Sequence, residues 1–444
     1  MKQQESIPTS KVARATQFVK TGVKIGGNYL KYNVKKLVNP DLGREELHND
    51  NAEDIYESLS QLKGSALKVA QMMSMDRNLL PRAYVDRFQL AQYSAPPLSA
   101  PLVAKTFRQY LGKTPHQLFD TFGMEAENAA SIGQVHRATK WGRQLAVKVQ
   151  YPGVADSIGS DLRMVRPMAV LLFQLNEKDL DRYMGEVQLR LLEETDYDLE
   201  LQRGQEIARA CAHIPNLIFP KYYAELSARR ILTMDWLEGQ HLRDFLATNP
   251  SQAVRNRIGQ AMWDFYDFQI HSLRRVHADP HPGNFLLQPD GTLGVIDFGC
   301  VKVIPQEYYE NYFALLNPDT IEDSAAVERI FYNLEFIVPD DSPRDKAFFS
   351  ALFVRMIRLL GKPFSDESFN FGDHAYFDDV YALAEELTKI EELKNSKVAR
   401  GSQHGLYVNR TYFGLYSLLN ELGAEVTTTK PDWLRPGKPL EMSA

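Results

Sequence analysis

The stretch from Val276 to Gly299 constrains the fold of this chain more than any other. Asp279 and Asn284 lie on a loop that contains two prolines and a glycine, residues that disfavour regular secondary structure. Two short apolar runs follow, separated by a Pro-Asp-Gly turn, and this pattern predicts a β-hairpin. Asp297 comes directly after the second run, before a Phe-Gly pair. We therefore expect the loop and the hairpin to hold three polar side chains close together.

These residue types suit phosphoryl transfer. A magnesium ion that bridges nucleotide phosphates prefers oxygen ligands, which the Asn284 amide and the Asp297 carboxylate supply. Asp279 can accept a proton from an attacking hydroxyl group or orient that group. A His-x-Asp-x-x-x-x-Asn loop followed by Asp-Phe-Gly is the pattern of kinase sites. His277 and His281 are four residues apart, as in zinc sites on helices, but the prolines near them disfavour such a helix. We predict a kinase-like nucleotide site.

Composition is typical of a soluble globular protein. The chain has 444 residues, of which 44% are hydrophobic and 24% charged. Its net charge of −6 argues against general nucleic-acid binding, and its two cysteines provide no disulfide framework. No secretory signal and no apolar run of transmembrane length is recognisable. We expect a cytoplasmic protein without a transmembrane helix.

Residues 1–48 form a basic N-terminal segment. Lysines alternate with apolar residues from Ser10 to Val38, which predicts an amphipathic helix that is interrupted at Gly26 and Gly27. Two interpretations stay open. Either the helix lies on an anionic membrane surface, as a peripheral attachment, or it docks on the body of the protein itself.

Residues 49–122 are predicted to form a helical extension, and residues 123–238 a small lobe that contains β-strands. In the extension, Lys68 is flanked by apolar residues, and on its own this indicates a lysine whose stem covers apolar surface. In the lobe, a loop of small residues from Asn128 leads into a strand, and Lys148 lies in the next strand. Small residues let backbone N–H groups approach phosphate oxygens. We expect Lys148 to pair with those phosphates rather than to face solvent.

Two further stretches are candidates to line the same site. Glu194, Asp196 and Glu200 belong to a stretch from Asp181 to Ala212 that is predicted to form one helix, and they either reach the nucleotide or belong to an acidic helix face in solvent. A strand that contains Met234 leads into a polar break, where a hinge between two lobes is expected. Met234 would line the adenine pocket there, and residues from Asp235 to Leu237 would offer backbone hydrogen bonds.

Together these residues resemble a known family. The motifs that carry the resemblance are Leu67-Lys-Val-Ala-Gln, Ala129-Ala-Ser-Ile-Gly-Gln-Val-His, Val147-Lys-Val-Gln-Tyr-Pro-Gly, Glu194-x-Asp196, His277-Ala-Asp-Pro-His-Pro-Gly-Asn and Asp297-Phe-Gly. From about Asn51 to Leu422 the chain is similar to the UbiB (AarF-like) family of atypical protein-kinase-like proteins. The resemblance implies an α+β, bilobal protein-kinase-like fold with a small β-containing N-lobe, an N-terminal helical extension and, over residues 239–444, a helical C-lobe.

The resemblance also implies cofactors and roles. The family binds ATP or ADP with Mg²⁺, and a lysine motif in its helical extension lies over the site and excludes peptide substrates. Acidic partners would compensate the charge of that lysine, since an unpaired buried charge is costly. The expected site residues are, for the nucleotide, Ala129, Ala130, Ser131, Gly133, Val135, Lys148, Met234, Asp235 and Leu237; for catalysis, Asp279, Lys148 and its helix partner Glu200; for the metal, Asn284 and Asp297; and for occlusion, Lys68, Gln71, Glu194 and Asp196.

Two positions depart from the family pattern. Ala70 stands where the lysine motif has glycine, and Asn128 stands where the loop of small residues usually begins with alanine. Many relatives also end in transmembrane helices, and no such segment is recognisable here. Membrane contact would then fall to the basic N-terminal helix.

Three functions fit these residues. The first is an ATPase-like kinase relative that supports isoprenoid quinone (ubiquinone-type) biosynthesis or membrane lipid handling, with quinone-precursor lipids, quinone-biosynthesis proteins and an anionic membrane as partners. The second is a true kinase of a protein or a small metabolite. The third is a scaffold switched by the nucleotide. The segment between Gly299 and the helix predicted at Pro305 leaves little room for an activation loop, which argues against a protein kinase.

Overall fold

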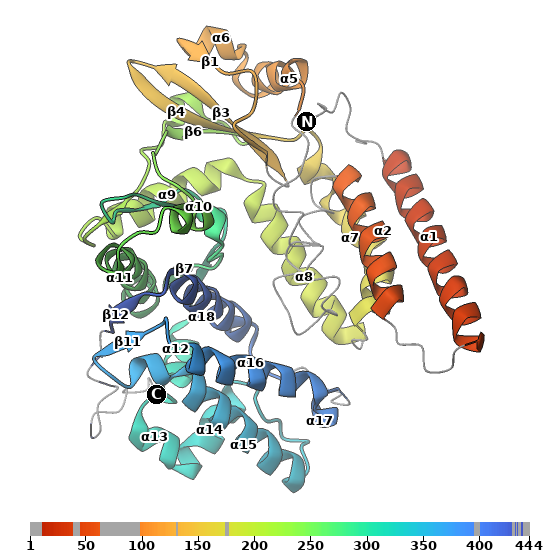
Figure 1. The fold of residues 1–444 in the computed structure, drawn as a ribbon, viewed down its shortest axis with the longest axis vertical. Coiled ribbons are helices and arrows are strands. Elements are labelled where there is room, and N and C mark those ends of the chain that lie inside the picture. The colour runs from red at the N-terminus through yellow and green to blue at the C-terminus, as the bar shows by residue number, and fades with distance from the viewer. Residues whose placement is uncertain are drawn as a thin grey trace. The chain divides into compact units, whose positions relative to one another are not determined.

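The computed structural model describes residues 11–38, 45–62, 98–129, 132–173, 177–394 and 400–428, with the isolated positions 431, 433 and 437 (Figure 1). The chain divides into two compact units, each made of two segments. The first unit contains Met1–Gln202 and Lys221–Trp236, and the second contains Arg203–Pro220 and Leu237–Ala444. The domain boundaries expected from the sequence, 1–48, 49–122, 123–238 and 239–444, stay predictions.

The first unit contains a five-stranded antiparallel sheet (Figure 1). Strands β1, β3, β4 and β6 follow one another across the sheet, and β2 pairs with β3. Trp141 and Gly142 have φ angles of 53° and 71°, so the β3–β4 turn is of the kind that matches the twist of a hairpin. The strands are β1 (Thr121–Phe122), β2 (Asn128–Ala129), β3 (Gly133–Lys140), β4 (Arg143–Gln150) and β6 (Ile231–Asp235).

The two faces of this sheet have different environments. On one face, Leu145, Val147 and Val149 of β4 belong to a buried cluster with aromatic residues such as Phe107 and Phe122. Side chains alternate between the faces of a strand, so Ala146 and Lys148 lie on the opposite face. Residue pairing puts Val135 of β3 opposite Lys148, and Met234 of β6 opposite Ala146. Val135, Lys148 and Met234 therefore share the face that does not contact this cluster.

Helices make up the rest of the described first unit. The predicted helix over residues 181–212 is in fact two helices, which is a correction to the sequence prediction. Thr195 and Asp196 interrupt it, and Asp196 Oδ1 accepts a hydrogen bond from the Leu199 N–H, as a residue at a helix start does. The helices are α1 (Lys11–Val38), α2 (Glu45–Leu62), α5 (Ala100–Leu111), α6 (Pro115–Leu118), α7 (Val154–Phe173), α8 (Glu177–Glu194), α9 (Tyr197–Ala210) and the 3₁₀ turn η1 (Ala224–Leu226).

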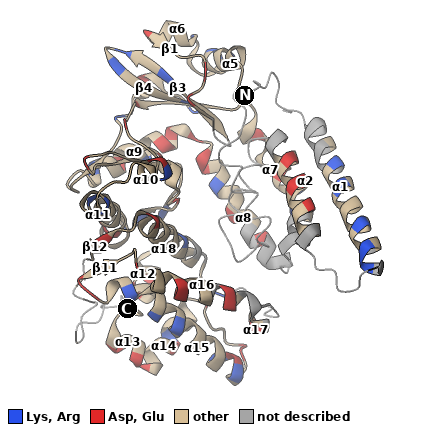
Figure 2. Cartoon of the chain, viewed as in Figure 1, with Lys and Arg blue, Asp and Glu red and all other residues tan. Residues whose placement is uncertain are grey.

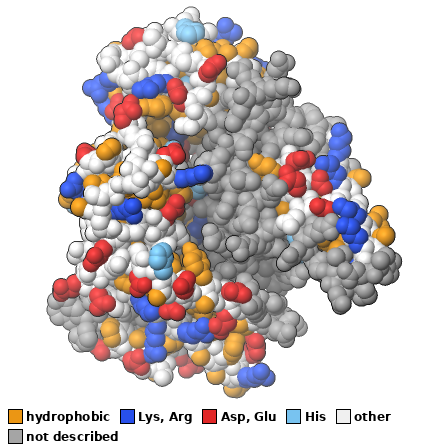
Figure 3. Space-filling view, viewed as in Figure 1, with side chains coloured by type: hydrophobic (Ala, Val, Ile, Leu, Met, Phe, Trp, Pro, Cys, Tyr) orange, Lys and Arg blue, Asp and Glu red, His pale blue; other side chains and the backbone are white. Residues whose placement is uncertain are grey.

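Helix α1 is continuous through Gly26 and Gly27, so the predicted interruption is wrong. Glycine weakens a helix by about 1 kcal/mol but does not remove its backbone hydrogen bonds. Helix α1 packs along α2, where Lys24 Nζ lies 2.9 Å from Asp54 Oδ1 and Lys31 Nζ lies 3.1 Å from Asp50 Oδ2. Figure 2 shows basic positions along α1 and acidic positions along the neighbouring α2, and Figure 3 shows basic and acidic side chains next to one another in this part of the molecule. The docking of α1 on its own chain, one of the two interpretations, is therefore observed.

A second face of α1 remains open. Val23, Leu30 and Val34 recur at near-helical spacing, and between 63% and 71% of each side chain is exposed. The opposite face, with Ile25 and Tyr32, is buried. Among the described residues, no helix is long and apolar enough to cross a membrane.

The second unit consists mainly of helices around short strands. The predicted hairpin is confirmed, because β8 pairs with β9 in antiparallel fashion, and β5 adds to β9 in parallel. Two further strand pairs are β7 with β10 and β11 with β12. The strands are β5 (Leu217–Ile218), β7 (Arg275–His277), β8 (Phe285–Leu287), β9 (Leu293–Val295), β10 (Val301–Val303), β11 (Ser368–Asn370) and β12 (Glu425–Thr427).

Helix α11 is the central helix of this unit. Its residues Trp263, Phe265 and Tyr266 are almost fully buried, and a π-helical turn extends it toward β7. The helical elements are α10 (Leu242–Ala247), α11 (Gln252–Phe268), η2 (Gln269–Leu273), η3 (Pro282–Asn284), α12 (Gln306–Ala314), α13 (Pro318–Glu322), α14 (Ser324–Asn333), α15 (Pro343–Leu360), η4 (Lys362–Phe364), α16 (His374–Lys389), α17 (Glu391–Lys394) and α18 (Gln403–Leu422).

Candidate functional site

Lys148 and Glu200 form an ion pair in the first unit. Lys148 lies on β4 and Glu200 in the first turn of α9, and Lys148 Nζ donates to Glu200 Oε1 at 2.6 Å. Only 12% of the lysine side chain and 3% of the glutamate side chain are exposed. Burying a charge is costly unless it is compensated, so each partner stabilises the charged form of the other. The structure thus brings together the two residues that the family resemblance pairs; their roles toward a nucleotide stay predictions.

Gly133 begins β3 where two backbones come close together. A Cβ atom at Gly133 would lie 2.8 Å from the Val149 carbonyl oxygen and 3.0 Å from the Tyr197 hydroxyl oxygen. Only glycine fits this approach without a shift of the backbone. Ala129, at the end of the short strand β2, pairs with Gln134, the residue that follows Gly133 in β3. Ala130 and Ser131 of the predicted phosphate loop lie outside the described residues. We call Gly133, Val135, Lys148, Glu200 and Met234 the strand site.

Two of the expected hinge residues already donate their backbone N–H groups to other parts of the protein. The N–H of Asp235 donates to the Lys221 carbonyl oxygen at 2.9 Å, and the N–H of Trp236 donates to the Gln144 carbonyl oxygen at 3.0 Å. Asp235 Oδ1 also accepts from the Tyr223 hydroxyl at 2.7 Å. The stretch therefore offers fewer N–H groups to a base than the sequence suggested. Leu237, in the second unit, contacts β9 at Gly294, where an added Cβ would lie 3.3 Å from Leu237 Cδ1.

Each member of the acidic pair predicted to reach the site contacts an arginine of the first unit. Glu194 Oε1 accepts from Arg190 Nε at 3.1 Å, and 8% and 1% of these side chains are exposed. Besides starting α9, Asp196 lies 3.5 Å from Arg229. Lys68 and Gln71, the residues predicted to occlude the site, lie outside the described residues.

The second unit holds Asp279, Asn284 and Asp297, which we call the hairpin site. Asn284 Nδ2 donates to the Asp279 carbonyl oxygen at 2.8 Å, and this bond fixes the orientation of the amide. The Ile296 N–H donates to the Asn284 carbonyl oxygen at 3.0 Å, so the residue before Asp297 is tied to the end of the loop. The amide oxygen of Asn284 and the carboxylate of Asp297 are hard ligands, and this donor set fits a magnesium ion.

The Asp-Phe-Gly segment is anchored by its phenylalanine. Phe298 is fully buried, with its ring centre 6.0 Å from that of Phe219 and 5.8 Å from that of His277. His277 is itself buried, and the Tyr266 hydroxyl lies 3.1 Å from His277 Nδ1. This histidine therefore packs in the interior. Asp297 Oδ1 accepts from the Gly299 N–H at 3.0 Å, which holds the carboxylate at the turn.

Helix α18 contributes residues that sequence reasoning missed. Arg410 Nη2 donates to Asp279 Oδ1 at 3.3 Å. One turn further along the helix, a Cβ atom at Gly414 would overlap the ring of Pro280, so α18 approaches the loop very closely. Arg410 follows Asp279 by more than a hundred residues, and no spacing rule links such distant positions. The sequence signal was limited to an arginine and, one turn later, a glycine on a helix rich in leucine and tyrosine.

Comparisons with known proteins identify a family for this chain. Residues 90–331 match the family described as ABC1 atypical kinase-like domain. A relative of Dictyostelium discoideum, "Probable serine/threonine-protein kinase abkA", is 25% identical over 95% of this chain and 78% of its own length. "Atypical kinase COQ8, mitochondrial" of Saccharomyces cerevisiae is 26% identical over 96% of this chain and 84% of its own length. "Atypical kinase COQ8B, mitochondrial" of Danio rerio is 27% identical over 86% of this chain, which spans 62% of that relative.

A solved structure has the same fold. It is the complex of Rv3197 from Mycobacterium tuberculosis with erythromycin, and it superposes with a TM-score of 0.59 at 26% sequence identity. The match covers 86% of this chain and 94% of the other. The kinase-like fold class expected from the sequence is confirmed by this neighbour and by the family match.

Proposed function

Because the chain belongs to the ABC1 atypical kinase-like family, we propose that it binds ATP or ADP with magnesium and acts as an ATPase-like atypical kinase that supports isoprenoid quinone biosynthesis. The observation that carries the proposal is the hairpin site. Asn284 and Asp297 present two oxygen ligands from adjoining strand ends, tied together by the bond between Ile296 N–H and the Asn284 carbonyl oxygen. The relatives named COQ8 and the motif resemblance support the quinone pathway as the setting.

Each site residue has a part in this proposal. Lys148, kept charged by Glu200, would bind phosphate oxygens, and Gly133 would let the backbone approach them. Magnesium, when bound, would neutralise charge on the phosphates, and Asn284 and Asp297 would hold it. Asp279 would orient the attacking hydroxyl or water and accept its proton. Its carbonyl oxygen and one carboxylate oxygen are held by Asn284 and Arg410, so the loop is ordered before a substrate arrives.

The segment after the Asp-Phe-Gly motif favours hydrolysis or a small acceptor over a protein substrate. Cys300 is buried, β10 pairs with β7 over Val301–Val303, and α12 begins at Gln306. This short connection supplies no long activation segment of the kind that positions peptides in protein kinases. The acceptor we favour is therefore water or a small lipid precursor.

Helix α1 is the part of the chain that we propose to contact a membrane surface. Its outward stripe of Val23, Leu30 and Val34 would enter the interface, since each of these side chains is more than half exposed. Two of its lysines, Lys24 and Lys31, are engaged with acidic residues of α2. These two lysines are therefore less available to anionic lipids, and the apolar stripe would contribute part of this attachment.

The decisive experiment compares wild type with Asp297→Asn. Titration calorimetry with ATP in the presence of magnesium is expected to show binding that weakens at least about tenfold, or about 1.4 kcal/mol, in the variant. Asp290→Asn is the matched control, because Asp290 is an exposed carboxylate in the turn of the same hairpin. Cells that lack the protein should recover their quinone levels with wild type and with Asp290→Asn but not with Asp297→Asn. Equal nucleotide binding by Asp297→Asn and wild type would overturn the proposal.

A further inference from the structure

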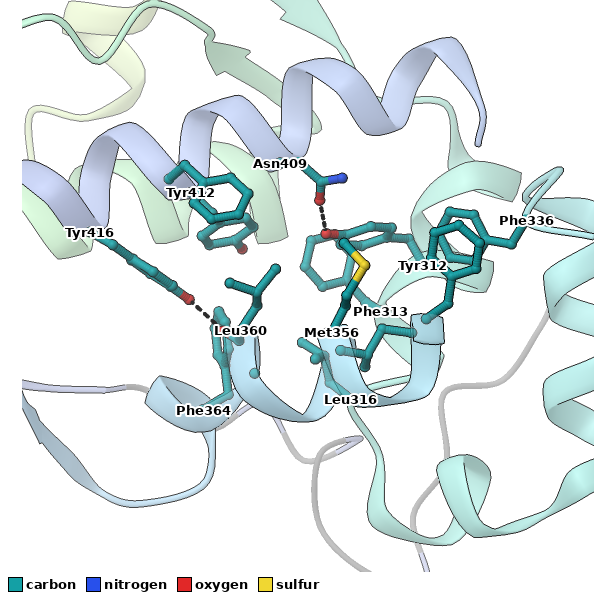
Figure 4. Close-up of a pocket in the computed structure, with 14 residues that line it drawn as sticks. Tyr312, Phe313, Leu316, Phe336, Met356, Leu360, Phe364, Asn409, Tyr412 and Tyr416 are labelled. Atoms are coloured by element: carbon teal, nitrogen blue, oxygen red, sulfur yellow. Dashed lines mark hydrogen bonds between the residues drawn. The ribbon is translucent and has the colours of Figure 1, made fainter. Parts of the chain in front are cut away.

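The second unit contains a cavity that the proposed reaction does not use. It has a volume of about 80 Å³ and lies between α12, α15 and α18 (Figure 4). Asp279, Asn284 and Asp297 are not among its lining residues. The residues that line it are Tyr312, Phe313, Leu316, Phe336, Phe353, Met356, Ile357, Leu360, Gly361, Phe364, Asn409, Tyr412, Phe413 and Tyr416.

The cavity walls are aromatic and uncharged. Phe336 and Phe353 stack with their ring centres 4.3 Å apart and 12° between the rings. None of the fourteen lining residues is acidic, basic or a histidine. Several of them, such as Tyr312 and Met356, are only partly buried, and 40% of Phe413 is exposed. Apolar side chains thus line a cavity that they do not fill.

A few polar groups lie at the cavity. The Tyr312 hydroxyl donates to Asn409 Oδ1, as Figure 4 shows. The Tyr416 hydroxyl is already engaged with the Leu360 carbonyl oxygen at 3.2 Å. The Asn409 amide and the Tyr312 hydroxyl are therefore the groups suited to fix the orientation of a ligand. An ionised ligand would find no compensating charge in this lining, so the occupant must be neutral.

Helix α18 lines this cavity and also contacts the loop of the hairpin site. Asn409, Tyr412 and Tyr416 of α18 line the cavity. From the same helix, Arg410 contacts the Asp279 carboxylate and Gly414 leaves space for the ring of Pro280. Protein interiors are close-packed, so a shift of α18 by a ligand on one side is felt by the loop on the other.

A second set of contacts connects the cavity with the Asp279 loop. The Tyr412 hydroxyl lies 3.2 Å from His271 Nε2, and His271 Nδ1 lies 2.9 Å from the Tyr309 hydroxyl. His271 belongs to the π-helical turn that precedes β7, the strand that leads into the Asp279 loop. A change at Tyr412 therefore has two routes to the loop, through Arg410 and through His271.

We propose that this cavity binds a neutral ring compound with one hydroxyl or carbonyl group, and that its occupancy alters the Asp279 loop through α18. Aromatic walls favour a planar ring, and Asn409 and Tyr312 supply its hydrogen-bond partner. A chain attached to the ring would leave past the exposed Phe413. The inference rests on the proposed function only in taking Asp279 as a catalytic residue; the binding itself is independent of it.

The test uses the full chain and 2-naphthol, a fluorescent neutral ring compound with a single hydroxyl group. Wild type is expected to bind a single molecule per chain, and Met356→Trp, which fills the cavity, should weaken binding at least about tenfold. Leu316→Trp fills the cavity from another wall, and it replaces Met356→Trp in the test if that variant does not fold. Ala351→Trp is the matched control, because Ala351 is an exposed residue of the same helix, α15, and does not line the cavity.

Hydrogen exchange then tests the coupling without any nucleotide. Binding of 2-naphthol should change the exchange of backbone amides over residues 278–287 in wild type and in Ala351→Trp, but not in the filled variants. Absent binding to wild type, or equal binding by wild type and the filled variants, would refute the site. Binding without any change in the loop would refute the coupling. Because neither measurement involves ATP, a failure of the proposed function would be recognised separately by calorimetry.

Discussion

The strand site and the hairpin site hold their charged groups in different ways. In the strand site, Lys148 and Glu200 are 52 positions apart in the chain, and each compensates the buried charge of the other. In the hairpin site, Asn284 and Asp297 are fixed by backbone groups two to five positions away. Substitution in the strand site should therefore affect folding as well as activity. Substitution in the hairpin site should affect mainly what the site binds.

The largest effect that tests this difference is expected for Glu200→Ala. The change leaves the Lys148 ammonium buried without this partner, and such losses destabilise by about 3–5 kcal/mol. Urea unfolding followed by circular dichroism would measure the loss. The double variant Lys148→Met with Glu200→Leu should recover most of the stability, because two apolar groups need no compensation. If Glu200→Ala unfolds like wild type, the pair does not have the structural role that separates the two sites.

The second unit contains a contrasting case, a carboxylate that is only 19% exposed and has one oxygen without a hydrogen-bond partner among the described residues. Burial, and then the nearby Asp264, raises the pKa of Asp267 to about 7. Among the described residues Asp267 Oδ1 has no hydrogen-bond partner, and His271 Nε2 lies 3.8 Å away. Burial also lowers the pKa of His271 to about 3, so this histidine is neutral and does not compensate the carboxylate.

Asp267 therefore makes the stability of the protein depend on pH. Its pKa is higher in the folded than in the unfolded state, so its contribution is full below about pH 4 and is lost as pH rises through about 7. The stability advantage of Asp267→Asn over wild type, measured as the free energy of unfolding, should therefore be larger at pH 8 than at pH 5, by on the order of 2–4 kcal/mol. Asp290→Asn, at an exposed position, should show no such gain. A gain that is equal at both pH values would contradict the assignment.

The smallest effect concerns the contact between α18 and the hairpin site. Gly414→Ala adds a methyl group against Pro280, and overpacking of this kind costs about 1–3 kcal/mol. We expect the rate of ATP hydrolysis to fall because the Asp279 loop shifts. Gly405→Ala, on the same helix, is the control, since its added Cβ would lie 3.4 Å from the Tyr308 hydroxyl, close to ordinary contact. Unchanged hydrolysis by Gly414→Ala would show that the loop tolerates movement of α18.

Local patterns in the sequence predicted local structure well. The hairpin of β8 and β9 followed from a Pro-Asp-Gly turn between apolar runs, and the structure confirms it. Where prediction failed, a weak local signal competed with packing or capping. The glycines at 26 and 27 did not break α1, which packs along α2. The helix predicted over residues 181–212 is interrupted at Thr195 and Asp196, where Asp196 caps the start of α9. Propensity is a weak prior of this kind, and tertiary contacts override it.

The amino-acid sequence by itself determined the chemistry available to this protein. The order of Asp279, Asn284 and Asp297 along one short stretch specified oxygen ligands on a hairpin, because turn residues and strand alternation act over a few residues. Only the tertiary structure decided which distant residues meet them. Arg410 on Asp279, Gly414 against Pro280 and the uncharged cavity behind them depend on how α18 packs. Side-chain packing between remote segments follows from the shape of the whole unit, and no spacing in the chain encodes it.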